Sequence, residues 1–156
     1  MFVAQHRTYP YAVDSCLTEF FGENSIVTGP ELFTKQDRDE ITGTHCLASK
    51  DKSNAMAYFF EWLPADEWMN HLKPQDRDGN TPMHNAMQNA SCNWLRTVLE
   101  KIDDDQKLAL LTIRNKKEKT PMHLATGRRD CFMILLELFA QEKYEAVFRA
   151  GMIEQE

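Results

Sequence analysis

The sequence predicts an all-α fold, a helical repeat solenoid of four units, because three kinds of residue recur at intervals of 39 positions. An interval at which turn residues and apolar residues keep the same register is typical of stacked repeats, in which each unit buries one face against its neighbours. The recurring residues are Thr42, Thr81 and Thr120; His6, His45, His84 and His123; and Leu17, Met56, Leu95 and Ile134.

The composition predicts a single globular domain over residues 1–156. Of these residues 42% are hydrophobic and 27% are charged, so the chain is too apolar to be disordered. The units are expected at about 1–39, 40–78, 79–117 and 118–156. The first should be a degenerate cap, and the last should be degenerate with a C-terminal cap, because the outer face of an end unit meets water.

Charge and hydropathy argue against several classes of protein. The formal net charge of −6 disfavours nucleic-acid partners, since that affinity comes from Lys and Arg at phosphates. No uncharged apolar run is long enough to cross a bilayer, and residues 1–7 lack the order of a secretory signal. We therefore expect a cytoplasmic protein with no membrane insertion.

The third unit shows the helical plan most clearly. A turn-forming cluster over 76–80 precedes Thr81 and Pro82, and this pair is typical of a helix start because Thr supplies an N-cap oxygen and Pro suits the first helical position. A short helix is predicted from about 82 to 89. A second, antiparallel helix is predicted over 93–102, where one face carries Leu95, Val98, Leu99 and Ile102.

The other units repeat this plan with less regularity. The fourth follows it closely from Thr120, the second more weakly from Thr42, and the first keeps only its second half. Inserts at 64–72 and 103–111 begin with acidic residues and carry apolar residues on one side, which suits an extra helical turn along the outer edge. An ordered loop is the alternative for both inserts.

The string Asp-x-x-Gly-x-Thr-Pro-Met-His-x-Ala from Asp76 to Ala86, with its partner from Thr120 to Ala125, resembles the ankyrin repeat. The family unit is about 33 residues, so this chain carries about six more per copy, a length similar to that in ankyrin effectors of intracellular bacteria. The sequence departs from the pattern at Glu40 and Glu118, where the family has a turn glycine, and at 43–44, where Gly-Thr replaces Pro-Met.

The resemblance implies a structural role for the histidines of this motif. In ankyrin-like units the histidine hydrogen-bonds backbone and the capping threonine, which ties neighbouring turns together. The structural motif residues are then Thr81, Pro82, His84, Thr120, Pro121 and His123. Histidines one period apart are also too distant to share a metal, whose bond to nitrogen is about 2.0 to 2.1 Å. We therefore expect no metal and no cofactor.

The sequence contains no motif that indicates catalysis. It has no glycine-rich phosphate loop, G-x-S-x-G elbow, H-E-x-x-H helix or C-x-x-C pair. An enzyme with an unconventional Cys/His site is an alternative, which fast labelling of Cys46 or Cys92 by iodoacetamide would reveal. Cys92 and Cys131 hold the same place in consecutive units, but packed helices lie about 8 to 10 Å apart, so we expect reduced thiols.

The aromatic residues have two interpretations. The pairs Phe20-Phe21 and Phe59-Phe60, with Trp62, suit packing in the core or between repeats. Trp68 and Trp94 fall off the main apolar stripe, so an edge position or a role as partner anchors is possible for them.

The resemblance also implies a binding surface, since ankyrin-like stacks present a concave face built from turn tips and first helices. In addition, the last turn is strongly basic in an acidic protein, with Arg114, Lys116, Lys117, Lys119, Arg128 and Arg129 close together in sequence. An acidic segment of another protein is the expected partner. The expected partner-binding residues are Arg38, Asp39, Ile41, Ser49, Lys50, Arg77, Asp78, Asn80, Gln88, Asn89, Lys116, Lys117, Lys119 and Arg128.

The sequence thus predicts a protein that binds another protein without catalysis. The preferred setting is a small bacterial effector that is secreted into the host cell cytosol, and the acidic end of 142–156 is similar to type IV export signals. An alternative is a viral inhibitor resembling I-kappa-B, which would sequester a transcription factor through the same face.

Overall fold

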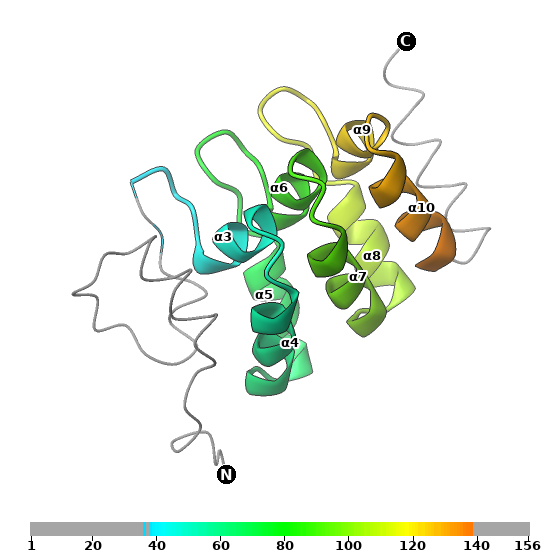
Figure 1. The fold of residues 1–156 in the computed structure, drawn as a ribbon. Helices are drawn as coiled ribbons and strands as arrows, with labels where there is room; N and C mark the ends of the chain where they lie inside the picture. The colour runs from blue at the N-terminus through cyan, green and yellow to red at the C-terminus, as the bar shows by residue number, and fades with distance from the viewer. Residues whose placement is uncertain (1–35, 37, 139–156) are drawn as a thin grey trace.

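The structure, a computed structural model, describes residue 36 and residues 38–138 (Figure 1). Within this part of the chain it is mostly helical and contains no strand, which confirms the all-α prediction at that level. The first helices of the successive units are α3 (Gly43–Ser49), α6 (Pro82–Gln88) and α9 (Pro121–Ala125), and the second helices are α4 (Ser53–Trp62), α7 (Cys92–Lys101) and α10 (Arg129–Leu138). Between these pairs lie a 3-10 turn, η2 (Ala65–Glu67), with α5 (Trp68–Leu72), and then α8 (Asp104–Leu111).

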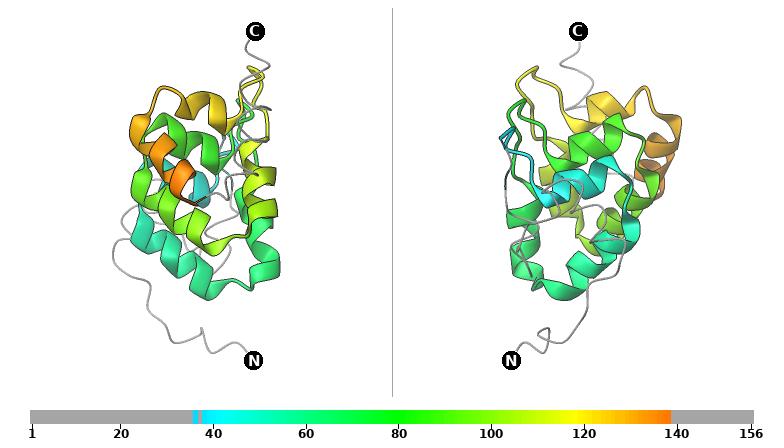
Figure 2. Two further views of the ribbon diagram at one scale, coloured as in Figure 1. Left: turned by 90° about the vertical axis from the view of Figure 1, so that its right-hand side faces the viewer. Right: turned by 60° about the vertical axis from the view of Figure 1, so that its left-hand side comes forward.

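Helices at corresponding places in the sequence pack side by side. Helix α6 lies between α3 and α9, and α7 lies between α4 and α10. The turns before α3, α6 and α9 project from the same side in a row (Figure 1). Figure 2 shows α5 and α8 as a further row beside the two stacked layers. Positions 39 apart are therefore neighbours in space.

The first helices begin where capping predicts. At Thr42, Thr81 and Thr120 the side-chain oxygen accepts a hydrogen bond from the backbone of the histidine three residues later, whose ring accepts from the threonine backbone. Such reciprocal caps stabilise a helix by about 1 kcal/mol. Gly43 replaces proline at the start of α3 without moving that start. Helix α6 ends at Gln88, one residue before the predicted end, and Asn89 is its C-cap.

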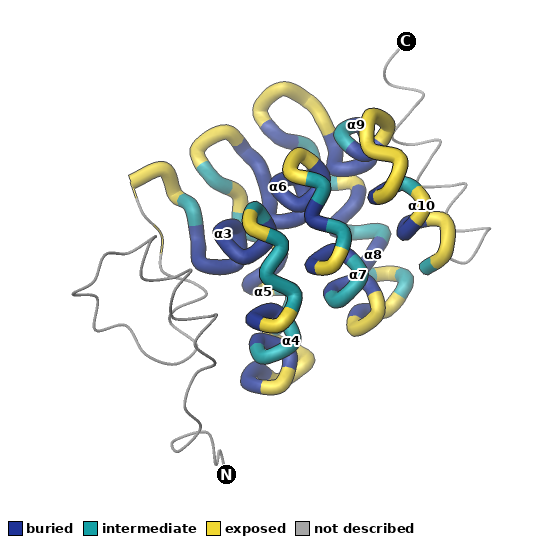
Figure 3. The backbone as a smooth tube through the Cα atoms, in the orientation of Figure 1, coloured by how far each residue is buried: buried dark blue, intermediate teal, exposed yellow. Residues whose placement is uncertain are grey.

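The core lies between the stacked layers (Figure 3). Leu95, Val98 and Leu99 of α7 are fully buried, as their spacing predicts. Trp94 is also 0% exposed, so the expectation of an edge position is wrong for this residue. Trp94 precedes Val98 by four residues, which places both side chains on the same face of α7.

The other described aromatic residues pack within the protein. Phe59, Phe60 and Trp62 of α4 are buried, which confirms their assignment to the core. Trp68 is half-buried and packs edge-on against Phe60, with ring centroids 4.8 Å apart. Its indole N–H donates to the Leu63 carbonyl at 2.9 Å. Phe20 and Phe21 lie outside the described residues.

The two inserts form helices, so the loop alternative is wrong. The Asp103 carboxylate caps α8 by accepting from Gln106 N–H, and Asp103 N–H donates in return to the Gln106 side-chain oxygen. Leu72 of α5 and Leu111 of α8 are buried against the core. None of the helices in the described part is both long and apolar enough to cross a membrane. The predicted first unit up to residue 35, with His6 and Leu17, and the C-terminal segment 139–156 lie outside the described residues.

Candidate protein interface

Two turns of the same construction precede α6 and α9. In the first, the Asp76 carboxylate accepts from the backbone N–H groups of Asp78 and Asn80, both at 2.9 Å. In the second, the side-chain oxygen of Asn115 accepts from Lys117 N–H at 2.9 Å and Lys119 N–H at 3.0 Å. Each turn is closed by a backbone bond from its first to its last residue. The tips therefore have fixed backbones before any partner binds.

Each of the three turns before α3, α6 and α9 contains one residue in the left-handed region. These residues are Glu40, Gly79 and Glu118, with φ angles of 62°, 80° and 60°. The two glutamates thus adopt the conformation for which glycine is suited, at a cost of about 1 to 2 kcal/mol each. A glutamate where the ankyrin pattern has a glycine therefore leaves the turn geometry unchanged.

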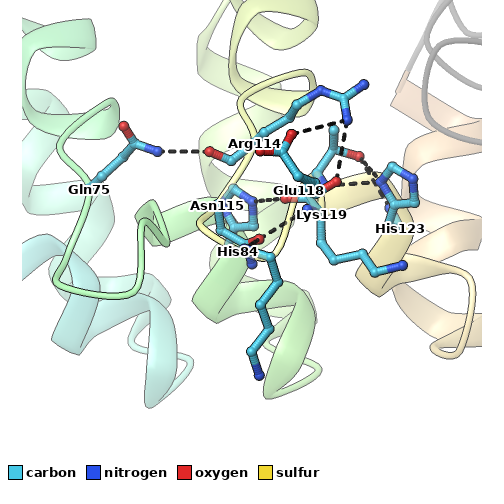
Figure 4. Close-up of polar contacts among 9 residues, drawn as sticks. Gln75, His84, Arg114, Asn115, Glu118, Lys119 and His123 are labelled. Atoms are coloured by element: carbon cyan, nitrogen blue, oxygen red, sulfur yellow. Dashed lines mark hydrogen bonds and ion pairs between the residues drawn. The ribbon is translucent and has the colours of Figure 1, made fainter. Parts of the chain in front are cut away.

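Histidine side chains join one turn to the next. The His45 ring nitrogen Nδ1 accepts from Thr42 N–H at 3.2 Å, so Nε2 carries the proton and donates to the Asn80 carbonyl at 2.8 Å. His84 repeats this arrangement, accepting from Thr81 and donating to the Lys119 carbonyl at 2.9 Å (Figure 4). Both ring nitrogens of each histidine are thereby occupied by structural hydrogen bonds.

The last histidine of the series differs from the others. His123 Nδ1 accepts from Thr120 N–H at 2.9 Å, but Nε2 has no partner within the described part of the chain. Burial lowers the pKa of both His84 and His123 below the usual value. The nearby Lys119 and Arg114 lower the pKa of His123 further. These contacts favour neutral rings.

Backbone and amide groups also bond between neighbouring turns. Arg77 N–H donates to the Asp39 carbonyl at 2.9 Å, and Lys116 N–H donates to the Asp78 carbonyl at 3.0 Å. Gln75 donates from its side-chain amide to the Arg114 carbonyl at 2.9 Å (Figure 4). The row of turns is therefore one continuous hydrogen-bonded edge.

Asn80 lies in a different environment from the one expected of a partner-binding residue. Its side chain is buried and accepts from the Asn115 side-chain amide at 2.9 Å, while its carbonyl accepts from His45. Position 80 lies one residue before an N-cap, so the chain there already turns inward. Asn80 holds two turns together and is not available to a partner.

Apart from Ile41, the structure divides the remaining expected residues into two rows. One row follows the turn tips, where all the residues are exposed; the other follows the C-terminal ends of α3, α6 and α9. Helices α3 and α6 have seven residues, about 10 Å, and α9 has five, about 8 Å, which sets the separation of the rows along each first helix. Ile41, just before α3, is half-buried, as is Ser49 at the end of that helix. The tip row is Arg38, Asp39, Arg77, Asp78, Lys116, Lys117 and Lys119, and the helix-end row is Ser49, Lys50, Gln88, Asn89 and Arg128.

Charge is distributed unevenly along the tip row. Arg77 forms an ion pair with Asp39 at 3.2 Å and also donates to the Arg38 carbonyl. Arg114 lies 3.7 Å from the Glu118 carboxylate. By contrast, the ammonium groups of Lys116, Lys117 and Lys119 form no ion pair with another described residue. The turn before α9 therefore carries three positive charges that no other described residue pairs.

Two polar contacts between units were not predicted from the sequence. The Asp51 carboxylate accepts from Trp94 N–H at 2.8 Å and from the Asn93 amide at 3.0 Å, so it caps α7 from the preceding unit. Lys107 is buried and donates to the carbonyl of Leu138 in α10 at 2.8 Å. Asp51 left no repeat signal because Ala90 stands at the equivalent place in the next unit.

The cysteines are closer than the helix spacing suggested. Cys92 Sγ lies 3.9 Å from Cys131 Sγ, because side chains at equivalent positions converge between two packed helices. None of the described cysteines, Cys46, Cys92 and Cys131, forms a disulfide. Among the residues that the structure describes, no group of three or more potential ligands is placed to hold a metal ion.

Comparison with known proteins identifies no family for this chain. No protein-family model matches the sequence, and no curated protein matches it.

Proposed function

We propose that this protein is a non-catalytic interaction module of the ankyrin type, with four units, which binds an acidic segment of a partner protein. The observation that carries the proposal is the last described turn, where Lys116, Lys117 and Lys119 are exposed on a backbone fixed by hydrogen bonds. The ankyrin assignment is supported by the Thr-x-x-His caps and by the histidine bonds between turns.

The rigidity of the turn favours binding. Asn115 and His84 already hold the backbone on both sides of Lys117, so little backbone freedom is lost when a partner arrives. The three ammonium groups lie within a span of four residues, which concentrates positive potential on a small area of an acidic protein. Such a patch steers a negatively charged partner and raises the association rate.

The neighbouring groups add to this patch. Arg128 donates to the Gln88 carbonyl at 2.7 Å, which holds one cation at the adjacent helix end. Asn89 donates to the Asn85 carbonyl, while Gln88 remains exposed beside it. An extended acidic segment that starts on the lysine tip can therefore meet polar and cationic groups on the helix-end row.

The setting we propose for this activity is the cytosol of a host cell, reached by secretion from an intracellular bacterium. Its support is the similarity of the 39-residue unit to elongated ankyrin effectors. This part of the proposal concerns where the module works and does not alter the binding chemistry.

The proposal is tested by stopped-flow binding of a labelled oligoglutamate peptide. The double variant Lys116→Glu, Lys117→Glu should reduce the association rate about tenfold at low salt, and the difference should shrink at high salt because exposed charges are screened. Adding Lys119→Glu should slow association further.

The matched control is the double variant Lys73→Glu, Lys101→Glu, which changes two exposed lysines away from the tip row and alters the net charge equally. It should keep most of the wild-type rate. Equal losses in both double variants would mean that net charge alone governs binding, and no loss in either would overturn the proposal.

A further inference from the structure

A pair of thiols joins the last two described units. Cys92 is the first residue of α7 and is half-buried, whereas Cys131 lies in the first turn of α10 and is fully buried. Their sulfur atoms are 3.9 Å apart, and both are reduced. Helices α7 and α10 pack directly against each other, and an exposed ion pair joins Arg96 of α7 to Glu137 of α10 at 2.9 Å.

We propose that Cys92 and Cys131 form a modification site, a dithiol that reacts with a small-molecule disulfide such as oxidised glutathione and closes to an intramolecular disulfide. A disulfide bond is about 2.0 Å long, so the two sulfurs must approach by about 1.9 Å. Rotation of the Cys92 side chain, which is the less confined of the two, provides part of that approach. This inference is independent of the proposed binding function.

The reaction proceeds by two exchanges. The Cys92 thiolate attacks one sulfur of oxidised glutathione, forming a mixed disulfide and releasing one glutathione thiolate. Cys131 then attacks Cys92 Sγ, which forms the protein disulfide, and its thiol proton passes to the departing second glutathione. Two electrons pass from the protein thiols to glutathione, and two molecules of reduced glutathione result.

The two cysteines have different parts in this sequence. Cys131 is closed off from solvent, and burial beside Cys92 raises the pKa of its thiol to about 12. Cys92 is therefore the thiol that meets the oxidant, and Cys131 is the resolving thiol. A mixed disulfide on Cys92 should form before the intramolecular bond.

Closure has a structural consequence for the stack. The disulfide would enclose residues 93–130, which include α8, α9 and the whole turn with Lys116 and Lys117. Cross-linking stabilises chiefly by limiting the unfolded chain, and it does so more for a longer enclosed segment. The last described unit would then be locked onto the one before it.

The test treats the full chain with oxidised glutathione, traps remaining thiols and maps the products by mass spectrometry after trypsin. The expected product links peptide 78–96, which contains Cys92, to peptide 130–143, which contains Cys131. The oxidised protein should melt about 5 to 10 °C higher than the reduced protein. A persistent mixed disulfide on wild-type Cys92, or linkage through Cys16 or Cys46, would overturn the proposal.

Cysteine variants distinguish the first thiol–disulfide exchange from the second. Cys131→Ala should stop at the mixed disulfide on Cys92, and Cys92→Ser should leave Cys131 unmodified because it is buried. Cys46→Ser is the matched control and should give the same linked peptides as the wild type. Should Cys131→Ala fail to fold, the peptide map and melting shift of the wild type still decide the question.

Discussion

The turn before α6 and the turn before α9 share a backbone design and differ in their surroundings and charge. In both, a side-chain oxygen at the first position accepts two backbone N–H bonds, and one residue has a positive φ. The first is packed between two neighbouring turns, and its arginine is paired with Asp39. Among the described residues, the second has a neighbouring turn on one side, and its lysines form no ion pair. The comparison shows that the residues which build a turn are separate from those which determine its surface chemistry.

The largest difference between the turns should appear at the positive-φ position. A Cβ on Gly79 would lie 2.7 Å from the backbone nitrogen of Lys116 and 3.0 Å from Cα of Asn115. Gly79→Ala should therefore lower the free energy of unfolding by about 3 kcal/mol, from left-handed strain plus the clash. Glu118→Ala, at the equivalent position, should change it by less than about 0.5 kcal/mol. Urea unfolding of both variants measures this, and equal effects would contradict the comparison.

The histidines provide the next test. His84 bonds to its own cap and to the next turn, but His123 bonds only to its own cap among the described residues. His84→Ala should therefore cost about 1 to 2 kcal/mol more than His123→Ala, because it also leaves the Lys119 carbonyl without its partner. Measured free energies of unfolding test this prediction. An equal loss of stability in His84→Ala and His123→Ala would contradict it.

A cap supplied between units should have a smaller effect. Asp51→Ala removes the carboxylate that caps α7, at a cost of about 1 kcal/mol. Ala90 lies one period after Asp51, so it holds the place from which an aspartate could cap α10. Its φ is 52°, which aspartate tolerates. Ala90→Asp should then stabilise the protein by up to about 1 kcal/mol. Thermal melts of Asp51→Ala and Ala90→Asp measure both changes in stability. A destabilising Ala90→Asp would show that α10 cannot be capped in this way.

The mildest perturbation is a change of pH. Burial lowers the pKa of His71, His84 and His123 below the usual 6.5. The unfolded chain therefore binds protons more readily than the folded one, so stability is retained above about pH 6.5 and falls as the pH drops below it. Urea midpoints at about pH 7.5 and about pH 5.5 should show this loss, and His84→Gln should reduce it. A midpoint that rises on acidification would contradict the neutral histidine assignment.

Local signals in the sequence predict much of the helical structure. The Thr-Pro pair and the spacing of Leu95, Val98 and Leu99 place the start of α6 and the buried face of α7, since capping and periodicity act over a few residues. The opening Asp103 predicts α8 for the same reason, although the sequence alone left a loop open there.

Contacts between units could not be predicted from such local signals. Asn80 resembles a surface turn residue in sequence, but it is buried because the next turn places Asn115 beside it. Asp51 caps α7 and Lys107 donates to a carbonyl of α10, so each contacts a helix of another unit, and neither position repeats the same residue one period later. The Cys92 and Cys131 sulfurs meet because side chains extend from helices whose axes are farther apart. Side-chain direction across a packed interface cannot be read from spacing along one chain.

The central claim is that an acidic segment binds the turn before α9, whose three lysines form no ion pair with another described residue, and not the turn before α6, whose arginine is paired with Asp39. Its most direct test is an NMR titration of the ¹⁵N-labelled protein with an oligoglutamate peptide. We predict the largest amide shift changes at Lys116, Lys117 and Lys119, smaller ones near Arg128, and little change at Arg77 and Asp78. Changes of equal size in both turns, or changes centred on α5 and α8, would contradict the claim.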